Sequence, residues 1–244
     1  MASLREGAAA TAGGSGTGGG ASGGAARPHR SSAPPWRRAG AARDLRFDLT
    51  GEWAQPLRKC ALDPANADQT ILYIDEQVVL ILKDRFPKAL YHALAVARDP
   101  ALRSIADLRP EHLPLLAHMR EVAVAWVRQE KAKDPGAVAF KLGFHAVPSM
   151  AQLHMHVASQ DFDSPTLKKK KHWNAFTTAF FLPLETVEAE LRDRGRLALM
   201  PPAEERRLEG LGLRCHGCGQ PYGALPELKQ HIVGCEGVRR LPGL

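Results

Sequence analysis

The amino-acid sequence predicts an α+β fold in which helices pack on an antiparallel sheet, with a small second unit near the C-terminal end. Short runs of branched aliphatic residues alternate with turn residues between positions 70 and 97, and again between 137 and 159. Residues 110–132 and 183–195 instead repeat apolar side chains at helical spacing. Strands joined by short turns pair antiparallel, so we expect the helices to cover one face of their sheet.

Composition divides the chain into three predicted parts. Residues 1–45 are rich in Gly, Ala, Ser and Arg and contain almost no branched aliphatic side chains, which predicts a disordered tail. Residues 46–197 are expected to form the main domain, and residues 198–244 the second unit with a short tail. We expect the protein to act in the nucleus. An acid-poor, Arg-containing N-terminus is also typical of transit peptides, which would direct the chain to the mitochondrion or chloroplast instead.

Charge and cysteine usage limit the class of protein further. The 244 residues carry a formal net charge of +7, which favours a polyanionic partner such as nucleic acid. No apolar run has the length of a membrane span, so we expect a soluble chain without a membrane partner. A secretory signal is also absent, which indicates a reducing compartment. The four cysteines are then expected to be metal ligands or free thiols.

The elements of the main domain follow one another with short connections. Residues 70–84 predict a hairpin around a polar turn, and residues 90–96 predict a third strand. A long amphipathic helix is expected over residues 110–132. The next strand has Gly143 at a close approach between backbones. Residues 183–195 predict a second helix, whose early acidic and late basic side chains agree with the helix dipole.

A histidine-rich strand follows a turn at Ser149. The two-residue period of a strand sends Gln152, His154 and His156 to one face, whereas the residues between them are apolar. Burial alone would favour aliphatic side chains on both faces, so this pattern indicates a site. Ser149 adds a hydroxyl group, and four lysines at 168–171 add positive charge. Phosphate chemistry needs such a nucleophile, hydrogen-bond donors and cations.

Other residues have simpler interpretations. His92, His112 and His118 are isolated histidines, which are more often satisfied core or surface residues than catalysts. Trp53 is expected to pack on the main domain.

The C-terminal part carries metal-ligand spacing. Cys215, Cys218, His231 and Cys235 form the pattern C-x2-C-x12-H-x3-C. A tight knuckle and a pair on one helix face can converge on a tetrahedral zinc ion. A unit of this size cannot bury enough apolar surface to fold alone. The sequence therefore predicts a structural zinc site that stabilises it.

Several motifs together resemble a known family. QLHMHVA is similar to the histidine-triad signature, and SQDFDSPTLKKKKHW followed by a zinc finger resembles the aprataxin family. The resemblance extends from Gly51 to Cys235 and includes GEWAQPLRKCALDP, YIDEQVVLILKDRFPKALYH and KLGFHAVPSM. It implies the histidine-triad fold. It also implies an enzyme that removes AMP from 5′-adenylated DNA nicks and breaks during single-strand break repair.

The resemblance also implies roles for individual residues. His154, at the middle position of the triad, would attack phosphorus and carry AMP covalently. His156 would bind the phosphate or help the leaving group, and His145 and Ser149 match the phosphate-binding loop. Histidine suits this chemistry because its ordinary pKa near 6.5 leaves it mostly neutral at pH 7.

Three further residues are expected to contact the nucleotide or its phosphate. Lys171 matches the family's phosphate-contacting lysine, and Asp84 matches the residue that holds the ribose hydroxyl groups. Gln152 replaces the first histidine of the triad. A backbone carbonyl of that position orients the nucleophile, so we expect activity to survive the replacement. The resemblance implies structural zinc, no catalytic metal and a monomer on DNA.

Two alternatives to this enzyme remain. One is a histidine-triad hydrolase of small nucleotides, which would need neither a finger nor a basic stretch. The other is a non-catalytic protein that binds DNA ends, in which Gln152 marks a decayed site. The forkhead-associated domain of many animal aprataxins is not recognisable in the sequence, so docking to phosphorylated scaffolds is not expected.

Overall fold

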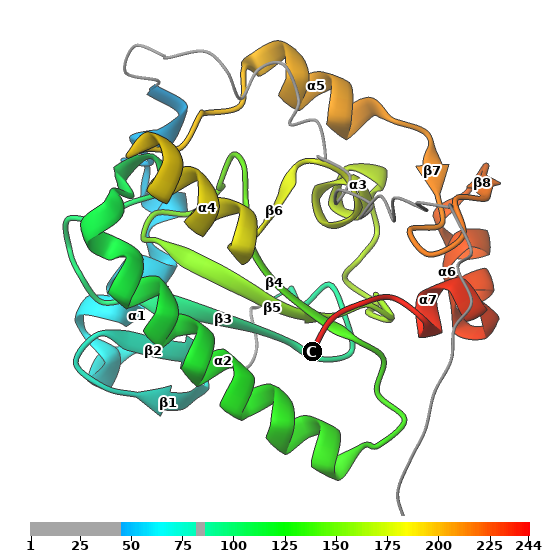
Figure 1. The fold of residues 1–244 in the computed structure, drawn as a ribbon, viewed down its shortest axis with the longest axis horizontal. Helices are drawn as coiled ribbons and strands as arrows, with labels where there is room; N and C mark the ends of the chain where they lie inside the picture. Colours follow the sequence, from blue (N-terminus) through cyan, green and yellow to red (C-terminus); the bar gives the residue numbers. More distant parts are fainter. Residues whose placement is uncertain (1–44, 82–85) are drawn as a thin grey trace, which may run out of the picture. The chain divides into compact units, whose positions relative to one another are not determined.

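A computed structural model describes residues 45–81 and 86–244 of the chain. One antiparallel sheet organises the main domain, with the strand order β1-β2-β3-β5-β4-β6 (Figure 1). The strands of this sheet are β1 (Ile71–Ile74), β2 (Val78–Ile81), β3 (His92–Ala97), β4 (Phe140–His145), β5 (His154–Ser159) and β6 (Phe181–Pro183). The predicted α+β fold with an antiparallel sheet is confirmed.

The longer helices pack on the sheet as their apolar spacing requires. Helix α2 (Leu113–Lys133) presents buried Leu116, Met119, Ala123 and Trp126 at intervals of three and four residues. Helix α4 (Leu184–Arg194) ends at Gly195, whose φ of 71° is the left-handed conformation that glycine favours. Both helices contact the face of the sheet that carries Ala93, Ala95, Met155 and Val157. That face forms the main hydrophobic core.

The opposite face carries the histidines and is covered by different elements. Helix α1 (Pro56–Leu62) packs Leu57 and Cys60 against Leu94 and Val96 of β3. Helix α3 (Lys170–Thr177) packs Trp173 and Phe176 in the cluster that contains Ala158. Helices therefore cover both faces, although the sequence predicts them on one.

Gly143 lets β6 approach β4 closely. A Cβ atom at this position would lie 2.4 Å from the backbone oxygen of Leu182 and 2.6 Å from the ring of Phe181. The close approach predicted from the sequence is confirmed.

The zinc-binding unit packs against α3. It contains β7 (Leu213–Arg214), β8 (Pro221–Tyr222), α6 (Leu225–Gly234) and α7 (Glu236–Arg239), and α5 (Pro202–Gly210) precedes it. The indole Nε1 of Trp173 donates to the backbone oxygen of Arg214 at 3.1 Å. The Nζ atom of Lys229 on α6 donates to the backbone oxygen of Ser164 at 2.8 Å. These contacts join the unit to the segment between β5 and α3. The predicted boundary at residues 197/198 stays a prediction.

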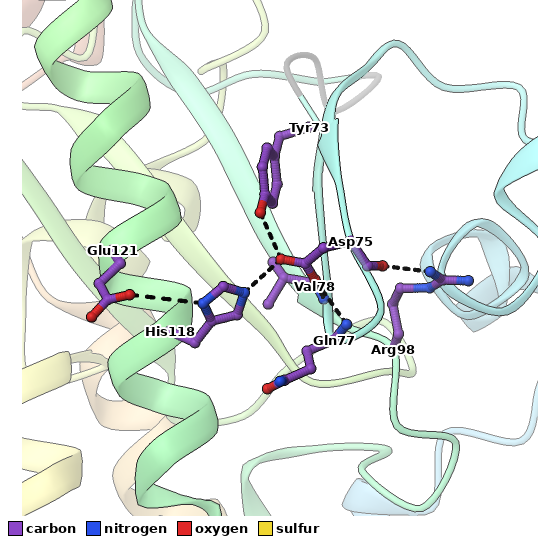
Figure 2. A network of polar contacts seen from close by, with 7 residues as sticks. All are labelled: Tyr73, Asp75, Gln77, Val78, Arg98, His118 and Glu121. Atoms are coloured by element: carbon purple, nitrogen blue, oxygen red, sulfur yellow. Dashed lines mark hydrogen bonds and ion pairs between the residues drawn. The ribbon is translucent and has the colours of Figure 1, made fainter.

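The turn between β1 and β2 is held against α2 by Asp75 (Figure 2). Its carboxylate accepts hydrogen bonds from the backbone N–H groups of Gln77 and Val78 and from the hydroxyl group of Tyr73. His118 on α2 lies with its Nε2 atom 2.6 Å from the same carboxylate. Burial raises the pKa of Asp75, but these hydrogen bonds together hold it well below the ordinary value. His118 is therefore a structural residue, as predicted.

The structure departs from the sequence-based expectation at Trp53. This indole is 69% exposed rather than packed on the domain. None of the helices in residues 45–81 and 86–244 reaches the length and apolarity that crossing a lipid bilayer requires.

Candidate active site

Four histidines meet on the face of the sheet that α1 and α3 cover. His154 and His156 project from β5, His92 from β3 and His145 from the end of β4. The ring centroid of His156 lies 5.2 Å from that of His154, 5.3 Å from that of His92 and 4.1 Å from that of His145. The alternation on β5 predicted the first two, and pairing with β3 and β4 adds the others.

Hydrogen bonding determines which ring nitrogen of His154 carries the proton. Its Nδ1 atom lies 2.8 Å from the backbone oxygen of Gln152. A carbonyl oxygen can only accept, so Nδ1 donates. A neutral His154 ring then carries its lone pair on Nε2, which makes Nε2 the nucleophilic atom.

A second chain of hydrogen bonds assigns the proton of His156. The backbone N–H of Lys88 donates to Nδ1 of His92 at 3.0 Å, so a neutral His92 carries its proton on Nε2. That Nε2 lies 3.0 Å from Nδ1 of His156 and donates to it. The proton of His156 is therefore on its own Nε2 atom. This atom is buried without a hydrogen-bond partner among the residues that the structure describes.

Burial keeps three of the four histidines neutral. It lowers the pKa of His92 to about 3, with a smaller contribution from the positive charge of Lys88. It also lowers the pKa of His145 to about 3, where the rings of Phe176 and Phe180 surround it. The pKa of His156 lies well below its ordinary value, first because of burial and then because of His145 and His154. A neutral His156 can donate one proton from Nε2.

Sequence analysis missed the role of His92. An isolated histidine gives no signal, and its contact with His156 arises because His92 pairs with Ala158 and so lies diagonally across from His156. No pattern in the sequence indicated a cation beside the cluster either. The positive charge of Lys88 lowers the pKa of His92, His145 and His156.

The other predicted contacts have different positions. Ser149 is exposed in the loop that leads from β4 to Gln152. Lys171 is exposed in the first turn of α3, and its charge contributes to lowering the pKa of the neighbouring His172. Asp84 lies outside the described residues. The contacts of Ser149, Lys171 and Asp84 with a nucleotide stay predictions.

Gln152 does not fit the predicted strand. It lies ahead of β5 with a φ of 86°, and its side chain is fully buried. Both protons of its amide group are used, because Nε2 lies 2.7 Å from the backbone oxygens of Ala97 and Asp99. The predicted contact with a phosphate is therefore replaced by contacts inside the protein.

The predicted zinc ligands converge. The ligand atoms of Cys215, Cys218, His231 and Cys235 all lie within 4.8 Å of one another. The Sγ atoms of Cys215 and Cys235 are 3.7 Å apart, and Sγ of Cys218 is 3.3 Å from Nε2 of His231. A tetrahedral zinc ion with ordinary bond lengths separates its ligands by roughly 3.3–3.8 Å. The donor set and its spacing fit structural zinc.

Two glycines let the knuckle lie against α7. A Cβ atom on Gly217 would lie 2.4 Å from the backbone nitrogen of Val238, and one on Gly237 would lie 2.7 Å from the backbone of Gly217. The zinc site therefore depends on direct packing of backbone on backbone.

Comparison with protein families finds two models that match successive parts of the chain. A family model described as "Scavenger mRNA decapping enzyme C-term binding" matches residues 58–172. Another, described as "C2HE / C2H2 / C2HC zinc-binding finger", matches residues 177–235. The first covers β1 to β5 with the four clustered histidines, and the second covers β6, α4 and the four zinc ligands.

Individual proteins match over longer stretches. The chain is 43% identical to an aprataxin of Gallus gallus over 206 residues, which are 84% of this chain and 61% of that protein. It is 31% identical to an aprataxin-like protein of Saccharomyces cerevisiae over 159 residues, 53% of this chain and 72% of that protein. A solved structure, "Hnt3 in complex with DNA and guanosine", has a TM-score of 0.54 and 26% identity, and the match covers 75% of this chain and 95% of that one. The chain thus spans about three fifths of the length of the chicken protein.

Proposed function

The chain belongs to the aprataxin family of histidine-triad proteins, and from this premise we propose that it removes AMP from the 5′ ends of adenylated DNA. The observation that carries the proposal is the hydrogen bond from Nδ1 of His154 to the backbone oxygen of Gln152. This bond puts the lone pair of His154 on Nε2, as a nucleophile requires. The acceptor of this hydrogen bond is the backbone oxygen of Gln152. The nucleophile therefore stays oriented although the first triad histidine is replaced.

The reaction would proceed in two displacements. Nε2 of His154 attacks the phosphorus of the adenylate, forming a P–N bond and breaking the P–O bond to the DNA 5′-phosphate. His156 donates a hydrogen bond from Nε2 to the departing phosphate oxygen, and the DNA 5′-phosphate leaves as a dianion. Water then attacks the same phosphorus and breaks the P–N bond. The proton of the water passes to solvent, His154 returns to its neutral form, and AMP is released beside a DNA 5′-phosphate.

Features of α1 support DNA as the larger substrate. Trp53, just ahead of α1, is 69% exposed, and a single-stranded or frayed DNA end offers bases on which an indole can stack. An open basin of about 680 Å³ begins at the neighbouring residue Glu52. Its lining residues include three basic side chains and two acidic ones: Arg58, Lys59, Arg103, Glu52 and Asp63. Arg58 also contacts Gln152, so the basin lies next to the start of the histidine strand. A hydrolase of small nucleotides would not need this basin.

We further propose that the protein acts as a monomer on DNA and in the nucleus. The net charge of +7 agrees with a nucleic-acid partner.

Single-turnover release of AMP from a 5′-adenylated nicked duplex tests the proposed function. We expect the parent chain to release AMP. His154→Ala should release none, because it removes the Nε2 lone pair that attacks the phosphorus. His112→Gln, which changes a histidine at the start of α2, serves as the matched control and should retain the parent rate.

Two other outcomes would replace the proposal. If the parent binds the nick and releases nothing, it is a DNA-end binding protein. If it hydrolyses adenosine phosphoramidates but not adenylated DNA, it is a small-nucleotide hydrolase.

A further inference from the structure

Gln152 has an unusual backbone conformation for a buried residue with a side chain. Its φ of 86° lies in the left-handed region, and its exposed fraction is 0%. Such a conformation is costly for residues other than glycine and persists only where the surroundings enforce it. The carbonyl of this same residue accepts the hydrogen bond from His154. The direction of that carbonyl therefore depends on whatever holds Gln152 in place.

Hydrogen bonds hold every part of Gln152. Its backbone N–H donates to the backbone oxygen of Arg103 at 2.7 Å. Its amide Nε2 donates to the backbone oxygens of Ala97 and Asp99, both at 2.7 Å. These three partners lie at the end of β3 and in the loop that follows it.

The remaining atom of the amide is held by a different element. Its Oε1 accepts a hydrogen bond from Nη1 of Arg58 at 2.8 Å. Arg58 belongs to α1, and the same Nη1 also donates to the backbone oxygen of Pro100 at 2.9 Å. Its guanidinium therefore joins α1 to the loop after β3 and to Gln152. A charged donor makes this bond stronger than one between neutral groups.

We propose that Arg58 is a positioning residue for His154, acting through Gln152. Arg58 fixes the Gln152 amide, which fixes the left-handed backbone, and this backbone directs the carbonyl that keeps the His154 proton on Nδ1. The inference rests on the proposed function only in assigning a nucleophilic role to His154. The hydrogen bonds themselves do not depend on it.

The hydrogen-bonding groups of Gln152 match those of Arg58 and of the two backbone carbonyls around it, which explains why glutamine is suited to position 152. An amide offers two donor protons and an acceptor oxygen, which satisfy two carbonyls and one guanidinium. A neutral imidazole offers one donor and one acceptor, so histidine at 152 leaves one of these three partners unsatisfied. Arg58 and Gln152 should therefore act as a coupled pair.

A double-mutant cycle tests this coupling with full-length, zinc-loaded protein. The variants are Arg58→Ala, Gln152→His and the double variant, assayed for single-turnover AMP release at saturating adenylated nick. We expect Arg58→Ala to lower the rate about tenfold in the parent background, the loss of one charge-assisted hydrogen bond, and less than about twofold in the Gln152→His background. Equal effects in both backgrounds would overturn the proposal.

Two controls separate positioning from other roles of a cation. Lys133→Ala removes the same charge from the last residue of α2, where Lys133 pairs with Glu130, and should leave the saturated rate unchanged. Arg58→Lys keeps a charged donor and should recover part of the rate. A direct role of Arg58 in binding DNA predicts a different pattern, in which Arg58→Ala raises only the DNA concentration needed for half-saturation. That pattern would overturn the proposal.

The protonation state of His154 gives a readout that does not depend on catalysis. The ¹⁵N chemical shifts of its ring nitrogens should show a proton on Nδ1 in the parent and in Lys133→Ala. Arg58→Ala should shift them toward a mixture of the two neutral forms. Unchanged shifts in a folded Arg58→Ala variant would overturn the proposal. If the shifts change but the parent releases no AMP, the positioning role stands and the proposed function fails.

Discussion

The histidines of the cluster should make the fold sensitive to acid. His145, a partly exposed residue whose ring atom Nε2 is buried, offers a direct test. Burial lowers its pKa to about 3, against about 6.5 in the unfolded chain. Between these values the unfolded chain binds the proton that the folded chain excludes. The free energy of unfolding is therefore highest above pH 6.5 and falls as the pH decreases toward 3.

The size of this effect follows from the two pKa values. Lowering the pH from 7 to 5 should cost about 2 kcal/mol for a histidine whose pKa moves from 6.5 to about 3. His92 should cost a similar amount, since its pKa also lies at about 3, and His156 contributes in the same direction. The parent should therefore lose at least about 4 kcal/mol between these pH values.

Urea unfolding at pH 7 and pH 5 measures the loss, and a substitution isolates one histidine. His145→Gln removes a titrating ring whose Nε2 has no hydrogen-bond partner in the described part of the chain. The variant should lose about 2 kcal/mol less than the parent between the two pH values. Protonation of the zinc ligands affects both proteins equally and cancels in the comparison. The same pH dependence in both proteins would refute the burial of His145 as the cause.

Two further predictions concern the zinc site and Trp53. A chelator that removes zinc should release the finger from α3 and expose Trp173, now 1% exposed, so the tryptophan emission should shift to longer wavelength in the parent but not in Trp173→Phe. An equal shift in both would show that the finger does not cover Trp173. Trp53→Ala should weaken binding to a nicked duplex by about 1–3 kcal/mol, measured by fluorescence anisotropy, because a stacked indole is lost. Trp53→Phe should retain most of the affinity, and an unchanged affinity in Trp53→Ala would show that the indole does not contact DNA.

Sequence patterns predicted those features that depend on residues close together in the chain. The zinc ligands fall in two pairs whose members are close together in the sequence, and His154 alternates with His156 within β5. The contact of His92 with His156 depends on the register between β3 and β5, which no local pattern specifies. That is why the histidine that assigns the proton of His156 was interpreted as an isolated core residue.

Gln152 and Trp53 illustrate a different limit. A two-residue period assumes extended backbone, and the positive φ at Gln152 breaks it just before β5 begins. Propensity alone favours a buried position for a tryptophan, whereas Trp53 is 69% exposed. Gln152 lies at the candidate site, where function can outweigh the preference of a single residue.

Identification of the residue that carries AMP during the reaction tests the role of His154 most directly. Adenylated nick labelled in the AMP moiety would be mixed with excess protein, quenched at alkaline pH within a single turnover, digested and analysed by mass spectrometry. We predict one adenylylated peptide that contains His154, no such peptide in His154→Ala and normal labelling in His112→Gln. AMP attached to another residue, or released without any adenylylated protein in a reaction that His154→Ala still performs, would contradict the assignment.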